Sequence, residues 1–316
     1  MRGLDIFCGG GGSSAGARKA GVELVGAIDM CPVATDTYRA NFPKAHVVTG
    51  KLEEIDLSSV RKQVGTIDIL LASPECTNHT CAKGAAPRSE ASRATALYAV
   101  EYAKAFKPRW LVLENVVHMR PWSRYGELKR ELEALGYHLA EQILDASDYG
   151  VAQSRRRLFL VGDREGPPGV VARKYPGPRK SVKSILDKTG TWETTLLHSR
   201  NRAKETLARA NRAFEALGDN SPFLLVYYGS DGSGGWQPVT RPLRTITTVD
   251  RFALVEPSEE GPRMRMLQVP ELRRAMGFED SYKFEVGTRR DRVRILGNGV
   301  CPPVMTEVVR ALFGQS

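Results

Sequence analysis

The strongest constraint on the fold of this chain is a short apolar run that ends abruptly. Residues Ile67 to Leu71 are mostly isoleucine and leucine, and the length of the run suits a buried strand. Pro74 ends the run, because proline has no backbone N–H to donate to a neighbouring strand. Cys76 follows two residues after Pro74. Open α/β sheets bind ligands at the carboxyl ends of their strands, so this run predicts a site at Cys76.

The same arrangement recurs along the first half of the chain. A second strand-like run, Trp110 to Leu113, ends on Glu114. Short apolar runs then alternate with helical segments as far as Leu158 to Gly162. This alternation is typical of α/β folds with a mostly parallel sheet and helices on both faces. We therefore expect a Rossmann-like α/β domain over residues 1–163, with a thiol and a carboxyl on neighbouring strand ends.

A nucleoside site is expected near the N-terminus. The first strand passes into the glycine-rich turn 9–12, which lets the backbone approach a ligand closely at a helix N-terminus. Asp29 ends the next expected strand, Val22 to Ile28, and an acidic residue there suits the hydroxyl groups of a ribose. Phe7 suits either the core or one face of a bound adenine.

The strand–helix alternation breaks after Gly162. Proline and glycine are frequent in residues 164–181, which indicates a boundary. We expect a small domain over residues 164–240, including a basic helix from about Arg200 to Leu217. A third segment, residues 241–316, is expected to end in a helix that returns to the first domain.

Charge points to a polyanionic partner. The chain has 46 Lys and Arg against 36 Asp and Glu, a net charge of +10. Residues 164–212 alone hold twelve Lys or Arg against four Asp or Glu, a local excess of +8. A solvated basic face is the alternative interpretation of this excess.

No apolar run approaches the ~20 residues that a bilayer-spanning helix needs. The first residues show no secretory segment, and five cysteines without framework spacing indicate reduced thiols. We therefore expect a cytoplasmic protein without a membrane segment. Cys76, His79 and Cys81 match no common closed zinc site, so no metal is expected. The remaining cysteines are expected to be free buried thiols: Cys8, Cys31 and Cys301.

Six sequence blocks, in this order, resemble those of the C5-cytosine DNA methyltransferase family. The blocks are Phe7 to Gly12 (Phe-x-Gly-x-Gly-Gly), Pro74-Glu75-Cys76 (Pro-Pro-Cys), Glu114-Asn115-Val116 (Glu-Asn-Val), Tyr149 to Arg157 (Tyr-Gly-x-x-Gln-x-Arg-x-Arg), Arg241 to Thr248 (the block after the target-recognition region) and Gly297 to Val300 (Gly-Asn-Ser-Val). They span nearly the whole chain. The resemblance implies a class I methyltransferase domain, with the small domain as the target-recognition domain.

The family's activity is the transfer of a methyl group from S-adenosylmethionine to C5 of a cytosine in a specific sequence of double-stranded DNA. The resemblance implies that the cytosine is flipped out, since C5 and C6 are poorly reachable in a stacked duplex. C5 is a poor nucleophile, so a thiolate must first add at C6, and Cys76 matches that residue. Glu114 is the natural acid for N3 of the ring. Arg155 and Arg157 match the arginines that hold the flipped base and the closed site. We expect the protein to be a monomer in solution.

The resemblance also implies a cofactor site. Phe7 takes the adenine face, and Asp29 the ribose. The other implied cofactor residues are Gly9, Gly11 and Gly12 of the turn, Met30, and Asn298 and Gly299 of the last block. A helix N-cap is the alternative role for Asn298.

The chain departs from the family pattern at three positions. Glu75 replaces the second proline before the nucleophile, and we expect its carboxylate to point away from the sulfur, because it would oppose thiolate formation. Lys51 stands where many members have an acidic residue for the adenine amino group, and Glu53 or Glu54 could serve instead. Gly299 replaces the usual serine.

Two alternatives to DNA methylation follow from the same residues. A cytosine of tRNA is the substrate of one branch of the family, but the Cys-Phe-Thr sequence of that branch is absent here. A DNA-binding relative without activity is the second alternative. The presence of Cys76, Glu114, Arg155 and Arg157 argues against it, whereas Glu75 and Lys51 argue for it.

Overall fold

The apolar runs of the first half form one seven-stranded sheet. The strands are β1 (Arg2–Ile6), β2 (Glu23–Asp29), β3 (His46–Thr49), β4 (Ile69–Ala72), β5 (Trp110–Val116), β6 (His138–Asp145) and β7 (Arg156–Asp163). Their order is β3-β2-β1-β4-β5-β7-β6, and β7 runs in the direction opposite to the other six strands. The expected Rossmann-like α/β fold is confirmed. This computed structural model describes residues 1–75, 89–172, 175–228 and 234–314, so Cys76, His79 and Cys81 lie outside the described residues.

Helices cover both faces of this sheet, because successive strand residues point to opposite sides. Leu71 packs with α1, α2 and α10 on one face, whereas Leu70 packs with α3, α5 and α6 on the other. The helices are α1 (Gly12–Lys19), α2 (Pro32–Asn41), α3 (Leu57–Val64), α4 (Glu90–Ala94), α5 (Tyr98–Phe106), α6 (Tyr125–Ala134) and α10 (Pro302–Leu312). Within the described residues, no helix combines the length and apolar content that crossing a bilayer requires.

The C-terminal helix α10 packs directly on α1. A side chain on Gly16 would come within 2.5 Å of the Pro302 carbonyl oxygen, so the close approach of the two helices requires a glycine there. Thr306 Oγ1 donates a hydrogen bond to the Gly16 carbonyl across the contact. The last residues of the chain therefore support the same sheet as the first.

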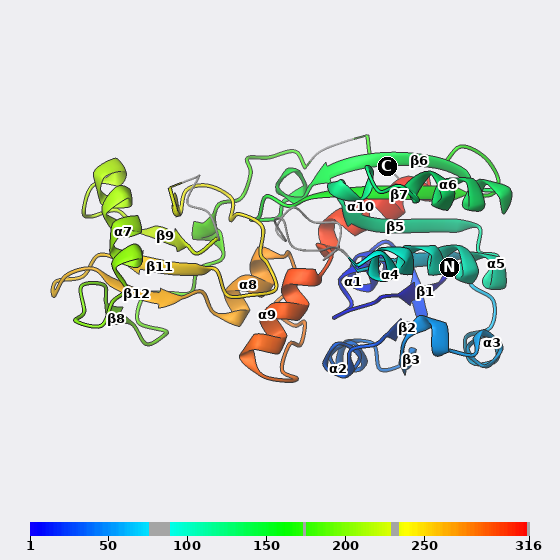
Figure 1. Cartoon of the computed structure of the whole chain (residues 1–316), viewed down its shortest axis with the longest axis horizontal. Helices are drawn as coiled ribbons and strands as arrows, with labels where there is room; N and C mark the ends of the chain where they lie inside the picture. Colours follow the sequence, from blue (N-terminus) through cyan, green and yellow to red (C-terminus); the bar gives the residue numbers. More distant parts are fainter. Residues whose placement is uncertain (76–88, 173–174, 229–233, 315–316) are drawn as a thin grey trace.

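A second sheet lies beside the first along the long axis of the molecule (Figure 1). Its strands are β8 (Thr195–Leu196), β9 (Phe223–Val226), β10 (Trp236–Pro238), β11 (Phe252–Glu256) and β12 (Arg263–Met266). They pair antiparallel in the order β10-β9-β11-β12-β8. Helix α7 (Lys204–Leu217) covers one face, within the segment where a helix was expected from about Arg200.

The second sheet does not stop at residue 240. Strands β11 and β12 come from the segment that sequence analysis assigned to the third part of the chain, and β9 pairs with β11. The other face of this sheet, including Leu224 and Leu254, belongs to the apolar cluster that also contains Leu71 of the first sheet. One continuous core therefore joins the two sheets, and the three expected segments are interleaved in space.

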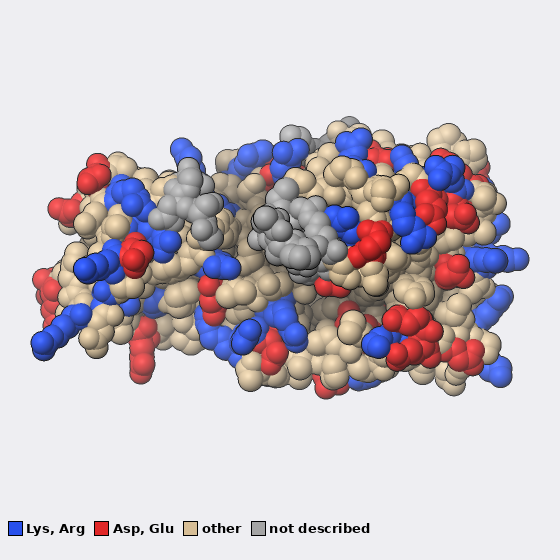
Figure 2. Space-filling model, in the orientation of Figure 1, with Lys and Arg blue, Asp and Glu red and all other residues tan. Residues whose placement is uncertain are grey.

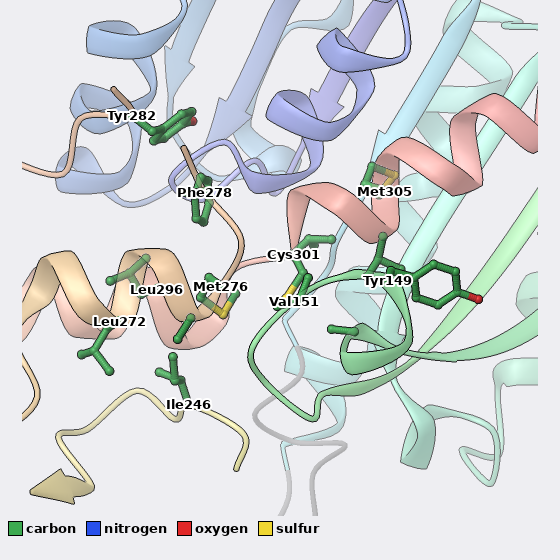
Figure 3. Packing of buried hydrophobic residues seen from close by; sticks show 14 of the residues in the cluster. Tyr149, Val151, Ile246, Leu272, Met276, Phe278, Tyr282, Leu296, Cys301 and Met305 are labelled. Carbon is green, nitrogen blue, oxygen red and sulfur yellow. The ribbon is translucent and has the colours of Figure 1, made fainter. Parts of the chain in front are cut away.

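The junction between the sheets is built by α8 (Val269–Ala275) and α9 (Arg289–Asn298). Figure 3 shows Met276 and Leu296 from this region packing toward Ile246 and toward Val151, which precedes β7. The same view contains Cys301, at the start of α10. Four parts of the chain thus meet in one apolar cluster, represented by Val151, by Ile246, by Met276, and by Leu296 with Cys301.

A buried ion pair adds directional contacts to this junction. Glu271 of α8 accepts hydrogen bonds from both terminal nitrogens of Arg265, at 2.8 and 2.7 Å. It also accepts from the backbone N–H groups of Gln268 and Asp187. Since its oxygens are fully used, the charge of Glu271 is compensated, and removing one partner of such a pair typically costs about 3–5 kcal/mol.

Candidate active site

The carboxyl ends of the parallel strands meet at one edge of the large sheet, next to the junction (Figure 1). Phe7 follows β1, Asp29 ends β2, Ser73 follows β4 and Glu114 lies in β5. Asp29 and Glu114 are predicted from their strand-end positions and Phe7 from the family resemblance of its block, whereas Ser73 has no predicted role. The parallel pairing of β2, β1, β4 and β5 brings them together.

The glycine-rich turn has a strained and tightly enclosed backbone. Phe7 adopts a φ of 57°, which is uncommon for a residue with a side chain and is typical of functional turns. Gly11 has a φ of 84° and caps the start of α1. A side chain on Gly12 would lie 2.2 Å from the Val300 carbonyl oxygen, so the last sequence block packs directly on this turn. The Phe7 side chain is half-buried against the cluster below α3 and α5.

Asp29 holds the turn from the neighbouring strand. Its two carboxylate oxygens accept hydrogen bonds from the backbone N–H groups of Gly9, at 2.9 Å, and Cys31, at 2.8 Å. Burial raises the pKa of Asp29, while these two hydrogen bonds lower it. Each oxygen keeps a second lone pair, so the carboxylate can still accept from a ribose hydroxyl. Met30 follows with 65% of its surface exposed.

Asn298 is the last residue of α9, and its side chain is exposed. The next helix, α10, has Cys301 at its N-cap, so Asn298 is not the N-cap of that helix. Gly299 is half-buried beside it. Asn298 and Gly299 therefore lie between the junction and the glycine-rich turn. Val300, the next residue, packs against Gly12 of that turn.

Glu114 is a buried acid beside an arginine. It is 6% exposed, and its Oε1 lies 3.2 Å from Nε of Arg157. Burial raises the pKa of Glu114, whereas the charges of Arg157 and Arg155 lower it. A cavity of about 10 Å³ next to the pair is also lined by Val300. A buried carboxyl with a raised pKa can hold a proton for a bound substrate.

Arg155 and Arg157 have different surroundings, although they are two residues apart. Arg155 is 3% exposed, and its guanidinium donates to three backbone carbonyls: Ile246 at 3.0 Å, Gly297 at 2.7 Å and Gly299 at 2.9 Å. These bonds join the start of β7 to the two last sequence blocks. The geometry thus makes Arg155 a structural clamp and leaves Arg157 beside the carboxyl.

The strand end that leads to Cys76 is tied on three sides. Ser73 Oγ lies 3.1 Å from Ser13 Oγ of α1. The Pro74 carbonyl accepts from Asn115 Nδ2 at 3.2 Å. Glu75 Oε2 accepts from Ser92 Oγ of α4 at 2.7 Å. Sequence reasoning gave Asn115 no role of its own, and only its place in the Glu-Asn-Val block marked it.

Lys51 lies after β3 and close to the cofactor edge, since the Gly50 N–H donates to the Asp29 carbonyl. Its ammonium forms an exposed ion pair with Glu54 at 3.0 Å. Glu54, one of the two acids that could bind the adenine amino group in place of the family's acidic residue, is therefore already paired with Lys51. Glu53 remains the other sequence-based alternative.

In the described ranges, no group of three or more His, Cys, Asp or Glu side chains is placed to hold a metal ion. Cys8 and Cys301 are free and buried, and Cys31 is free and half-buried. Cys31 therefore differs from the burial expected for it. Its Sγ accepts from Arg294 Nη2 at 3.4 Å.

The fold and the strand-end site define an α/β enzyme of the methyltransferase class. Residues 1–314 match the family described as C-5 cytosine-specific DNA methylase, and the chain belongs to this family. Its activity is therefore the methylation of cytosine at C5 in DNA.

Individual relatives cover different parts of the chain. Type II methyltransferase M.XorII of Xanthomonas oryzae pv. oryzae is 27% identical over 365 aligned residues, which cover 99% of this chain and 84% of the relative. A tRNA (cytosine(38)-C(5))-methyltransferase of Rattus norvegicus is 30% identical over 172 residues, 53% of this chain and 44% of the relative. The crystal structure of a putative DNA modification methyltransferase from an Escherichia coli prophage has a TM-score of 0.71 at 17% identity. It covers 100% of this chain and 99% of its own, and it supports the fold.

Sequence reasoning missed a buried acid beneath the glycine-rich turn. Asp5 of β1 is fully buried, and its Oδ2 accepts from Ser14 Oγ at 2.6 Å, which in turn lies 2.7 Å from the Tyr38 hydroxyl. Asp5 Oδ1 has no hydrogen-bond partner among the described residues. Burial raises the pKa of Asp5 from 3.8 to about 7, with the charge of Asp29 adding to the rise. The apolar residues around it in the sequence gave no signal of this role.

Replacing Asp5 by asparagine should remove part of the pH dependence of stability. The folded state holds the Asp5 proton more tightly than the unfolded state, so its stabilising contribution is present below about pH 4 and lost as pH rises through about 7. Between pH 5 and 8 the wild type should lose of the order of 2 kcal/mol relative to Asp5→Asn. Urea unfolding at a series of pH values measures this difference.

The matched control is Asp36→Asn, because Asp36 is exposed on α2 and pairs with Arg39. Its unfolding free energy should follow the wild type at each pH. Parallel curves for wild type and Asp5→Asn would show that Asp5 is ionised in the folded state across this range.

Proposed function

We propose that this chain uses S-adenosylmethionine to methylate a cytosine within a specific sequence of double-stranded DNA, through a covalent bond between Cys76 and C6 of a flipped base. The observation that carries the proposal is the buried Glu114 beside Arg157, on the strand next to the one that leads to Cys76. The parallel pairing of β4 with β5 puts the strand that leads toward Cys76 beside the strand that carries Glu114. Glu75, which precedes Cys76, is held by Ser92.

The cofactor site fits the residues of the turn. No atom lies within 4 Å of the position that a side chain on Gly9 would take, so the turn is open there, and Asp29 beside it has lone pairs to spare. Phe7 would cover the adenine, Gly11 and Gly12 would shape the turn, and Asp29 would bind the ribose. Met30, Asn298 and Gly299 would complete the site. When bound, S-adenosylmethionine supplies the methyl group.

In the proposed reaction the Cys76 thiolate adds to C6 and makes C5 nucleophilic. Glu114 in its protonated form donates a hydrogen bond to N3, which draws the electrons of the ring toward N3 and favours addition. After C5 gains the methyl group, its proton leaves and the bond to sulfur breaks. Arg157 holds Glu114 and the base side of the site, and Arg155 holds the two last sequence blocks closed around it.

Duplex DNA that carries 5-fluorocytosine should trap the enzyme, because fluorine does not leave C5 as a proton does. A covalent complex in the presence of S-adenosylmethionine is expected for the wild type and for Cys81→Ser, and none for Cys76→Ser. Glu114→Gln should lower turnover about 10²–10⁴-fold and change DNA affinity little. Denaturing gels measure the complex. A Cys76→Ser protein that still methylates DNA would remove Cys76 as the nucleophile.

Sequencing of methylated cytosines in the DNA and tRNA of cells that express the protein distinguishes a DNA substrate from a tRNA substrate. Methylation at one DNA sequence supports the proposal, whereas modification of tRNA alone supports the tRNA alternative. Relatives named type II methyltransferases favour a restriction–modification or phage setting. We place the enzyme in the cytoplasm, on chromosomal or phage DNA, and expect it to act as a monomer.

S-adenosylmethionine or its demethylated product should raise the thermal midpoint of the protein. A ligand that binds only the folded state stabilises it by about 2.7 kcal/mol at 100 times its dissociation constant. Asp29→Asn should reduce this shift, because an amide accepts fewer hydrogen bonds than a carboxylate. Asp36→Asn should keep it. The absence of any shift for the wild type would favour the inactive DNA-binding alternative.

We further propose that the small sheet and α7 read the DNA sequence. The support is the +8 charge of residues 164–212 and an arginine–tyrosine contact near the end of β9, where the Arg209 guanidinium lies 5.3 Å from the Tyr227 ring. Lysine and arginine there would bind phosphates, and polar side chains would reach base edges. Most of the glycine run, residues 229–233, lies outside the described residues.

Exchanging residues 195–240 for those of a family member with another target should move the methylated sequence and keep the chemistry. The exchange replaces β8, β9 and β10 and leaves β11 and β12 in the parent, so the donor segment has to re-form the pairing of β9 with β11 and of β8 with β12. Sequencing of methylated DNA gives the result. A chimera that stays active on the parent's sequence would place specificity elsewhere.

A further inference from the structure

A second cavity lies beside the edge strand β6 and has no part in the reaction described above. Its volume is about 430 Å³, and it opens between the end of β6 and the described residues of the segment 171–179. Side chains of mixed character line it: Ile143, Asp145, Asp148, Tyr149, Arg156 and Arg179. Two acids and two arginines would make the net charge of the cavity lining zero, but the two acids are bonded to groups other than Arg156.

Both acids are already satisfied by other groups. Asp145 accepts hydrogen bonds from the backbone N–H and hydroxyl of Ser147, from the Ser154 hydroxyl and from the Arg155 N–H. Asp148 pairs with Arg179, whose Nη2 lies 2.6 Å from its Oδ1. Among the described residues, no hydrogen bond or ion pair joins either carboxylate to Arg156, although Asp145 stands opposite Arg156 in the strand pairing.

Arg156 therefore keeps its charge uncompensated. Its side chain is exposed, and within the described residues its guanidinium makes no hydrogen bond or ion pair. Arg155 and Arg157 flank it, and side chains alternate along a strand, so Arg156 points to the opposite side from these two. The planar guanidinium of an arginine in such a place suits an anionic partner that offers two oxygens, such as a phosphate.

The position of the cavity connects it to the active site. Leu144 lines this cavity and also the small cavity beside Glu114 and Arg157. Arg156 and Arg157 are neighbours in β7, and Arg156 lines this cavity whereas Arg157 lines the small one. Phosphates recur along each DNA strand with a rise of about 3.4 Å, so a strand that delivers a cytosine to Glu114 has further phosphates within a few nucleotides of Arg156.

The surrounding charge agrees with an anionic partner. Lys180 and Lys183 follow Arg179 in the sequence, and both are exposed. In Figure 2, acidic and basic side chains are interspersed over the end of the molecule that holds the large sheet, whereas lysine and arginine gather near the upper rim between the two sheets.

We propose that the cavity beside β6 is a phosphate subsite for the DNA backbone flanking the target cytosine, with Arg156 as its ligand. The Asp148–Arg179 pair forms a wall of the cavity, and Tyr149 and Ile143 give it an apolar side. The inference rests on the proposed function, because it takes the cytosine to enter beside Glu114. It assigns a contact with DNA to the catalytic domain, outside the small sheet.

The test measures the affinity of the full chain for a mixed-sequence DNA duplex by fluorescence anisotropy over a range of KCl concentrations. Arg156→Ala should weaken binding several-fold at low salt and lower the slope of log K against log salt by about 1, the value for one lost phosphate contact. Arg156→Glu should weaken binding further, and Arg156→Lys should keep most of the slope. Inorganic phosphate should compete more weakly in Arg156→Ala than in the wild type.

Arg130→Ala is the matched control, since Arg130 is an exposed arginine on α6 and makes no ion pair within the described ranges. Its salt slope should equal that of the wild type. An Arg156→Ala protein that keeps both the wild-type slope and its thermal midpoint overturns the subsite. Failure of the wild type to methylate DNA would instead overturn the proposed function, so the two failures are distinguishable.

Discussion

The contacts of the Arg155 guanidinium are the constraint on which the rest of the site depends. A buried cation is costly unless it is hydrogen-bonded, and Arg155 meets this requirement with the carbonyls of Ile246, Gly297 and Gly299. Those carbonyls belong to the last two sequence blocks, more than ninety residues further along the chain. The clamp therefore fixes the position of Val300, which packs against Gly12, and the glycine-rich turn in turn rests on Asp29.

Two buried acids, Glu114 and Asp5, have different roles in the large domain. Glu114 and Asp5 both have a pKa raised by burial, but the charge of Arg157 lowers that of Glu114, while the charge of Asp29 raises that of Asp5 further. Glu114 lies beside the small cavity, where a substrate can use its proton. Asp5 lies under α1 with Ser14, where its state affects stability. Surroundings, rather than residue type, separate the two roles.

The sequence predicted much of the large sheet, because β1, β2, β4 and β5 are short apolar runs with a polar residue at their ends. It also marked Glu114, Asp29 and the glycine-rich turn by position. It did not predict the small sheet as it stands, because antiparallel pairing joins β9 to β11 across a segment boundary. Hydrophobic periodicity indicates that a strand exists and gives no partner for it.

The sequence by itself determined the family, through six blocks in a fixed order, and with it the reaction class. Local chemistry was sufficient for this, because each block carries its residue types within a few positions. Only the tertiary structure decided that Arg155 is a clamp, that Asp29 holds the turn and that Arg156 keeps a free charge in the described part of the chain. These properties depend on contacts across long sequence distances, and hydrogen bonding and burial exist only once the chain has folded.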